Sequence, residues 1–248
     1  MSLVIYEHPL NEKMRSFMRI EYLFAQIENC KNLQHEFQPI GFFEALFAMV
    51  DLLERNDIRG ELTKELERSE HSLVKWAQHP EICNEALEEM LKRVIALQSA
   101  LSKKHRICTP IKDDPFLASI KQRFAIPGGH CNFDLPQLHF WMQLPPQEKS
   151  QQISGWLNHL ASTHEAITLV LTFARERGAF TSIKAANGFY QDNTENIELV
   201  RIKYTPAYGA YPTVSGNKYR YAVRFMRLCD QAGRTNVEED IMFSLARC

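Results

Sequence analysis

The densest cluster of potentially reactive side chains lies between Ile126 and Trp141, in the segment IPGGHCNFDLPQLHFW. Four of its residues could do chemistry: His130, Cys131, Asp134 and His139. Cysteine, histidine and aspartate together are the residue types of a cysteine hydrolase or of a metal site. A structural explanation is stronger, because the Pro-Gly-Gly sequence indicates a turn, Asp134 is expected to cap a helix, and Cys131 can be a small buried side chain.

The rest of the sequence offers no better catalytic site. It contains no phosphate-binding loop, no dinucleotide-binding glycine pattern, no H-E-x-x-H and no G-x-S-x-G. His159 and His164 are five residues apart, across an expected helix break. The six cysteines include no C-x-x-C pair and indicate reduced thiols in a cytoplasmic protein. We therefore expect no enzyme activity, no cofactor and no metal.

Overall charge and hydropathy exclude other classes. The 248 residues carry a formal net charge of −1, which excludes a strong global attraction to nucleic acid or to an anionic membrane. No run approaches the roughly 20 apolar residues that span a bilayer, so we expect no direct membrane insertion. The first residues, MSLVIYEHPLNEK, lack the basic start and long apolar stretch of a secretory signal.

Charge is nevertheless concentrated locally, between Leu199 and Arg227. This segment has no acidic residue and six basic ones: Arg201, Lys203, Lys218, Arg220, Arg224 and Arg227. A basic strand face can hold an acidic peptide or a phosphate backbone, although an ordinary solvated strand face is an alternative.

Period-two alternation tells which of these side chains are exposed. It predicts one strand near 200–204 and another over 219–225, whose inward side chains are Tyr219, Tyr221, Val223 and Phe225. Lys218, Arg220 and Arg224 then form the exposed face, and Arg201 and Lys203 extend it from the neighbouring strand. We expect these five residues to contact the partner.

Before residue 179 the spacing is helical. Gly and Pro together number only 21, which is typical of a mainly helical chain. Apolar residues at three- and four-residue spacing over 62–76 and 84–104 predict a long antiparallel helical hairpin. In the hairpin prediction, Trp76 and Ile95 belong to the packed stripe. We predict an α+β fold: a helical domain over 11–178, and a small antiparallel β domain from 179–248 completed by an N-terminal strand from 1–10.

Several long strings resemble, in order, the ZapD family of bacterial cell-division proteins. They are YEHPLNEKMRSFMRIE (Tyr6 to Glu21), GELTKELER (Gly60 to Arg68), IPGGHCNFDLPQLHFW (Ile126 to Trp141), NGFYQDN (Asn187 to Asn193) and YPTVSGNKYRYAVRFM (Tyr211 to Met226). The resemblance covers essentially the whole chain. The least similar parts are 29–39, 103–115 and the last three residues.

The resemblance implies a cytoplasmic, non-enzymatic factor that binds FtsZ, the tubulin-like GTPase of the division ring. Members of the family are dimers that recognise the C-terminal tail of FtsZ, bundle its protofilaments and lower its GTPase activity. Such a factor is recruited to mid-cell through FtsZ and promotes assembly of the Z-ring. Arg19 is a secondary candidate for contacting FtsZ, because it lies one helix away from the N-terminal strand expected to join the sheet. Arg55, near an expected helix end, and His139, within a matching string, are weaker candidates, since a structural role explains them almost as well.

The sequence also suggests two other functions. A nucleic-acid-binding module would use the same basic strand face, but alternation places its aromatics opposite the arginines, whereas a stacking platform needs both on one face. A cysteine hydrolase around Cys131 has no motif beyond the cluster itself.

Overall fold

The computed structural model describes residues 3–33, 35, 37–55, 57–77, 84–103, 107–217 and 219–248. They form two compact units, one from Met1–Met18 with Leu171–Cys248 and the other from Arg19–Val170. Helices α1 (Glu12–Cys30) and α9 (Ala161–Glu176) contribute to both units. That 11–178 and 1–10 with 179–248 are separate domains stays a prediction. Within the described ranges, no helix is long and apolar enough to cross a membrane.

The helical region contains the two helices predicted over 62–76 and 84–104. Between α1 and α9 the helices are α2 (Gln38–Arg55), α3 (Ile58–Trp76), α4 (Asn84–Ser102), α5 (Thr109–Lys112), α6 (Pro115–Phe124), α7 (Pro136–Met142) and α8 (Pro146–Asn158). Asn11 caps α1 by accepting the Met14 amide at 2.8 Å, and Asp114 caps α6 by accepting the Leu117 amide at 2.9 Å. The predicted cap at Asp134 is wrong, because α7 starts after Leu135 without a side-chain cap.

Aromatic packing forms the core of the helical unit. The Phe43 ring lies 5.1 Å from Trp141, and Phe116 stacks on Trp156 at 6.0 Å. Both tryptophans also find polar partners, because Trp156 donates to Asp114 at 2.9 Å and Trp141 donates to Gln152 at 2.7 Å. The IPGG string therefore ends in a side chain that packs this core.

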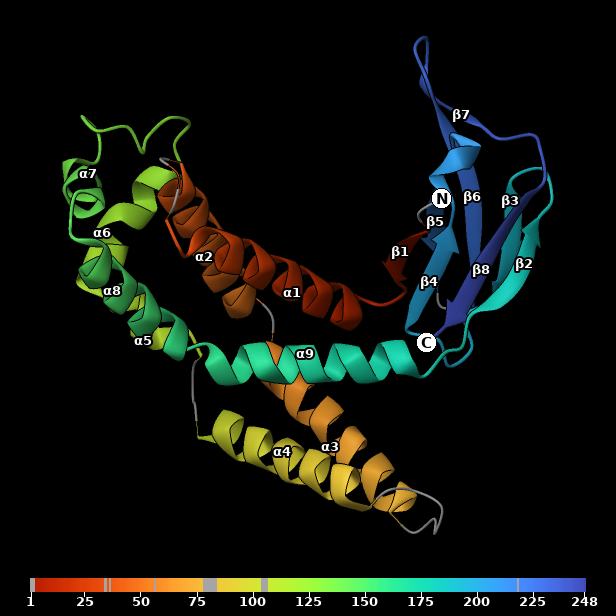
Figure 1. Cartoon of the computed structure of the whole chain (residues 1–248), viewed down its shortest axis with the longest axis horizontal. Helices are drawn as coiled ribbons and strands as arrows, with labels where there is room; N and C mark the ends of the chain where they lie inside the picture. Colours follow the sequence, from red (N-terminus) through yellow and green to blue (C-terminus); the bar gives the residue numbers. More distant parts are fainter. Residues whose placement is uncertain are drawn as a thin grey trace. The chain divides into compact units, whose positions relative to one another are not determined.

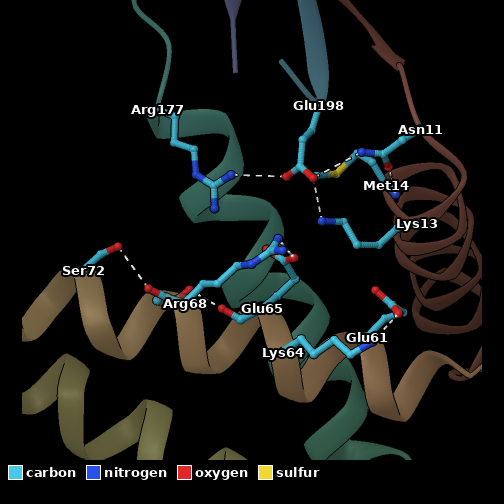
Figure 2. A network of polar contacts seen from close by, with 11 residues as sticks. Asn11, Lys13, Met14, Glu61, Lys64, Glu65, Arg68, Ser72, Arg177 and Glu198 are labelled. Atoms are coloured by element: carbon cyan, nitrogen blue, oxygen red, sulfur yellow. Dashed lines mark hydrogen bonds and ion pairs between the residues drawn. The ribbon is translucent and has the colours of Figure 1, made fainter. Parts of the chain in front are cut away.

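Helices α3 and α4 pack against each other as the expected hairpin (Figure 1). Glu65 is buried on α3 and pairs with Arg68 at 2.6 Å (Figure 2). Two residues of the predicted stripe are not packed, because Trp76 is 50% exposed and Ile95 is 47% exposed. The packed apolar face of these two helices is thus narrower than the spacing of their apolar residues indicated.

The other unit contains two antiparallel sheets (Figure 1). Sheet A has the order β1-β4-β8-β2, with β1 (Val4–Pro9), β4 (Leu199–Tyr204), β8 (Ile241–Arg247) and β2 (Thr181–Ala185). Sheet B has the order β3-β6-β5, with β3 (Phe189–Asn193), β6 (Arg220–Cys229) and β5 (Tyr211–Gly216), and β7 (Gly233–Asn236) also pairs with β6. The N-terminal strand completes sheet A by pairing with β4, as predicted, which confirms the α+β fold.

The two sheets share one apolar core. Phe225 of β6 lies 5.4 Å from Phe243 of β8 and 6.1 Å from Tyr204 of β4. Tyr221 and Val223 are fully buried beside them. Each sheet thus has an inner, apolar face and an outer, polar one.

Two sequence-based expectations about these strands are wrong. The strands near 200–204 and 219–225 are not neighbours, because β4 belongs to sheet A and β6 to sheet B. The Pro/Gly-rich connection between them contains a 3₁₀ turn at Pro206–Tyr208 and the strand β5. In addition, Tyr219 precedes β6 and is 68% exposed, so it does not point inward.

A tight turn carries the chain from sheet A to sheet B. Asn187 and Gly188 lie between β2 and β3 with φ angles of 49° and 67°, a left-handed conformation that asparagine and glycine adopt readily. A Cβ atom on Gly188 would lie 2.6 Å from the Val237 carbonyl oxygen. Both local conformation and close packing therefore require glycine at this position.

Glu198, just before β4, ties together segments that are distant in sequence. Its carboxylate accepts from Lys13 at 2.6 Å, from Asn11 at 3.2 Å and from Arg177 at 3.3 Å (Figure 2). Burial alone would raise the pKa of Glu198, but the Lys13 hydrogen bond and the neighbouring positive charges lower it below its ordinary value. These contacts join the start of α1 and the chain after α9 to sheet A.

Gly178 should be sensitive to any added side chain, because a Cβ atom there would lie 2.3 Å from the Arg247 carbonyl oxygen. We expect Gly178→Ala to lower the free energy of unfolding by about 1–3 kcal/mol. In the matched variant Gly155→Ala, the helical glycine has no atom within 4 Å of the added carbon. That change should instead raise stability by about 0.5–1 kcal/mol. Denaturant unfolding of both variants measures the difference, and equal stabilities would contradict the close-approach argument.

Candidate partner-binding site

Two arginines of β6 point away from the core because their neighbours are buried. Tyr221, Val223 and Phe225 are fully buried, so alternation directs Arg220 and Arg224 to the outer face of sheet B. Strand pairing surrounds them with polar and aromatic residues. The outer side chains of β3 and β5 in this register are Phe189, Gln191, Asn193, Thr213 and Ser215. We call this surface, with Arg220, Ala222 and Arg224 at its centre, the basic face.

Neighbouring residues hold both arginines in place. The Arg224 guanidinium lies over the Phe189 ring, 4.8 Å from its centre. The Thr213 hydroxyl donates to the Arg224 carbonyl at 2.9 Å. At the other end, the Asn217 side chain accepts the Arg220 amide at 3.1 Å, and the Asn217 amide donates to the Arg220 carbonyl at 2.9 Å. Both arginines thus lie on a strand whose backbone is well paired.

An open hollow of about 310 Å³ lies on the basic face beside Arg220. It is lined by Gln191, Ser215, Gly216, Asn217, Arg220, Tyr221 and Ala222. The small side chain of Ala222 leaves space between the two arginines, whose Cα atoms are about 13 Å apart along the strand. Within the described ranges, neither arginine has a carboxylate partner.

This arrangement suits a partner that carries carboxylates. A guanidinium holds a carboxylate with two parallel hydrogen bonds, and two guanidinium groups on one strand face can hold two acidic residues of one extended chain. Phe189 adds an apolar contact on the same face. Tyr221 and Phe225 do lie on the face opposite Arg220 and Arg224, as predicted, but Phe189 of β3 places an aromatic ring beside Arg224 on the basic face. The argument against nucleic acid is therefore weaker than the sequence indicated.

Arg201 and Lys203 do not extend this surface, because they lie on the outer face of sheet A. Arg201 donates to Glu7 at 2.8 Å and to the Arg175 carbonyl at 3.1 Å. Lys203 lies over the Phe180 ring, 4.5 Å from its centre. Burial alone would raise the pKa of Glu7, but hydrogen bonds and charges from Arg175 and Arg201 lower it below its ordinary value.

The local positive charge is also smaller than the sequence indicated. Arg201 is paired with Glu7, and Arg227 is paired with Glu239 at 3.0 Å. Both acidic partners lie outside the segment Leu199 to Arg227, so composition could not reveal them. Lys218 lies outside the described residues. Of the predicted basic cluster, Arg220 and Arg224 therefore remain on the outer face of sheet B, and neither has a carboxylate partner among the described residues.

Three candidates belong to the other unit. Arg19 is exposed on α1, Arg55 is exposed as the last residue of α2, and His139 is exposed on α7. Their contact with a partner stays a prediction.

Comparison with known proteins identifies the family. The ZapD family model, described as a cell division protein, matches residues 18–224. The cell division protein ZapD of Serratia proteamaculans (strain 568) is 38% identical over 245 residues, which cover 99% of this chain and 97% of that protein. The chain belongs to the ZapD family. The ZapD protein of Idiomarina loihiensis is 41% identical over 246 residues, covering 99% of this chain and 96% of that protein.

Within this ZapD chain, the Cys131 cluster has no catalytic arrangement in its described contacts. The Cys131 thiol donates to Asp134 at 3.5 Å, and Asp134 also lies 3.7 Å from Arg123. The His130 ring packs on Phe124 at 5.8 Å. No hydrogen bond joins Cys131 to a histidine among the described residues, and these residues contain no group of three or more side chains able to hold a metal.

Sequence reasoning missed the β3 and β5 contributions to the basic face. The string NGFYQDN contains Phe189 and Gln191, and YPTVSG contains Thr213 and Ser215. Apolar and polar residues alternate in YPTVSG but not in NGFYQDN, and neither string shows that its strand pairs with β6. A search for strands on either side of the Asn187-Gly188 turn could have found β3.

Glu7 gives a pH-dependent test of the contacts that occupy Arg201. We expect Glu7→Gln to lower the free energy of unfolding at pH 7 by about 1–3 kcal/mol, because Arg175 and Arg201 lose a charged acceptor. Since folding lowers the pKa of Glu7, its contribution is complete above the ordinary value of about 4.5 and is lost as pH falls through the folded-state pKa. The gap between variant and wild type should therefore shrink in acid.

Urea unfolding at several pH values measures this gap. Glu195→Gln is the matched control, because Glu195 is exposed in the same unit and should shift stability by less than about 0.5 kcal/mol. A gap for Glu7→Gln that stays constant down to pH 2 would contradict the ion-pair assignment.

Proposed function

We propose that this chain is a non-enzymatic cell-division factor that binds FtsZ through the basic face, with the C-terminal tail of FtsZ as the bound segment. The observation that carries the proposal is the pair Arg220 and Arg224, exposed on one face of sheet B with no carboxylate partner in the described structure, and with an open hollow beside Arg220. Family membership supports a role in cell division. The formal net charge of −1 disfavours the alternative, a nucleic-acid-binding module.

Bundling follows from bivalency. A homodimer presents two basic faces, so one dimer can hold tails from two protofilaments and gains avidity from modest single-site affinity. Bundled filaments exchange subunits more slowly, which lowers GTP hydrolysis without any nucleotide site in this chain. The factor would act in the cytoplasm and reach mid-cell through FtsZ, where cross-linking promotes Z-ring assembly.

Charge reversal on the basic face tests the binding site. We expect Arg220→Glu/Arg224→Glu to fold like wild type, because exposed substitutions change stability by about 0.5 kcal/mol or less. Its binding to FtsZ polymers should fall at least tenfold, since each lost charged contact typically costs about 2–5 kcal/mol. Wild-type binding should also weaken as salt is raised. Co-pelleting with FtsZ polymers at two salt concentrations measures both effects.

A matched control separates the site from overall charge. Lys92→Glu/Lys103→Glu makes the same change in net charge at two exposed positions on and just after α4, and it should co-pellet like wild type. If the arginine variant bundles FtsZ as wild type does at both salts, the basic face is not the binding site. Arg19, Arg55 and His139 would then be the next residues to change.

The bivalent mechanism makes a separate prediction about oligomeric state. We expect a homodimer of about twice 28.8 kDa at micromolar concentration. Light scattering coupled to gel filtration measures the mass directly. A monomer that still bundles FtsZ would contradict bivalency through dimerisation and would require two FtsZ sites in one chain.

A further inference from the structure

In the described part of the chain, β5 forms one edge of sheet B, beside the basic face. The directions of the backbone N–H and C=O groups in β6 show which backbone groups of β5 are available to pair with another strand. The Phe225 amide donates to the Gly188 carbonyl at 2.8 Å, and the Phe225 carbonyl accepts from Val237 at 3.1 Å. Odd-numbered residues of β6 therefore direct their backbone groups toward β3 and β7. Even-numbered residues point toward β5, as the Arg220 carbonyl does when it accepts the Asn217 amide.

The register then determines which β5 groups face outward. Tyr211, Thr213 and Ser215 lie opposite even-numbered residues and pair with β6. Pro212, Val214 and Gly216 direct their backbone groups to the opposite edge. Pro212 fits this position because it has no amide hydrogen to leave unpaired. In the described part of the chain, β5 pairs with no strand but β6, and the Val214 amide and carbonyl have no hydrogen-bond partner.

Charge distinguishes this edge from the opposite edge of sheet B. The strand β3 is followed by Glu195, and its preceding turn is held by Asp240, which accepts the Asn187 amide at 3.0 Å. Asp240 ends the acidic run Glu238-Glu239-Asp240, in which Asp240 pairs with Lys184 at 2.6 Å and Glu239 pairs with Arg227 at 3.0 Å. In contrast, the segment from Leu199 to Arg227, which contains β5, has no acidic residue. An acidic segment therefore meets fewer acidic residues at the β5 edge than at the β3 edge.

We propose that an acidic, extended peptide segment of the partner binds as an added strand on the free edge of β5. Its backbone pairs with Val214, and alternate side chains lie on the basic face beside Thr213 and Ser215. Adjacent strands are about 4.8 Å apart, so this peptide lies about 10 Å from β6. A carboxylate and a long arginine side chain together span that gap. The inference rests on the proposed function and adds how the bound segment is held.

The first test is residue-specific hydrogen exchange on the full chain, measured by NMR with and without a synthetic peptide of the FtsZ C-terminal tail. We expect the Val214 amide to exchange at least tenfold more slowly in the complex, because it gains a hydrogen bond. The Gln191 amide on β3 is the matched control and should not change. Protection of Gln191 in place of Val214, or of neither in the saturated complex, would overturn the proposal.

The second test removes the outward amide. Val214→Pro should fold, because that amide is not used within sheet B, and it should bind the peptide five- to tenfold more weakly. Val214→Ala keeps the amide and should bind within twofold of wild type. If the proline variant unfolds, exchange in the wild type decides. A folded proline variant that binds like wild type would refute strand addition.

These outcomes separate the two proposals. If Arg220→Glu/Arg224→Glu loses FtsZ while folded Val214→Pro binds the peptide normally, the basic face stands and strand addition fails. If wild type binds neither the peptide nor FtsZ polymers, both proposals fail.

Discussion

Packing between the two sheets is the interaction on which the candidate site depends. Phe225 of β6 meets Phe243 of β8 and Tyr204 of β4 in one apolar core. Burying Phe225, Val223 and Tyr221 leaves the intervening residues no direction but outward. A shift of one residue in the β6 register would bury both arginines and expose three large apolar side chains. The core thus determines the chemistry of the outer surface.

Long-range ion pairs determine which basic residues stay available to a partner. Glu7, close to the start of the chain, engages Arg175 and Arg201, and Glu239 engages Arg227. Arg247 likewise joins Asp192 across the two sheets, at 2.7 Å. Such pairs convert positive charge into structural contacts that hold the unit together. Arg220 and Arg224 differ because Phe189 and backbone groups position them without neutralising them.

The position of the candidate site on a strand affects the free energy of binding. Arg220 and Arg224 are carried by a central strand, with paired neighbours on both sides over most of its length. Less backbone ordering is then required when a partner binds, and this saves binding free energy. In the proposed bundling function, modest affinity per face suffices, because avidity comes from using two faces together.

The sequence by itself determined the local features of this protein. Helical spacing predicted the α3–α4 hairpin, and alternation placed Arg220 and Arg224 on an exposed face. Asn11 and Asp114, whose residue types favour helix N-caps, cap α1 and α6. These features depend on residues within a few positions of one another, so periodicity and capping chemistry reveal them. The matching strings also indicated the family before any fold was known.

Only the tertiary structure decided which strands are neighbours and which charges are free. It placed Arg201 on sheet A and Arg220 on sheet B, paired Arg201 with Glu7, and brought Phe189 under Arg224. It also exposed Trp76, although its spacing matched a packed stripe. Pairing between strands and ion pairs between distant residues depend on how the whole chain packs, and spacing along a sequence carries no information about that.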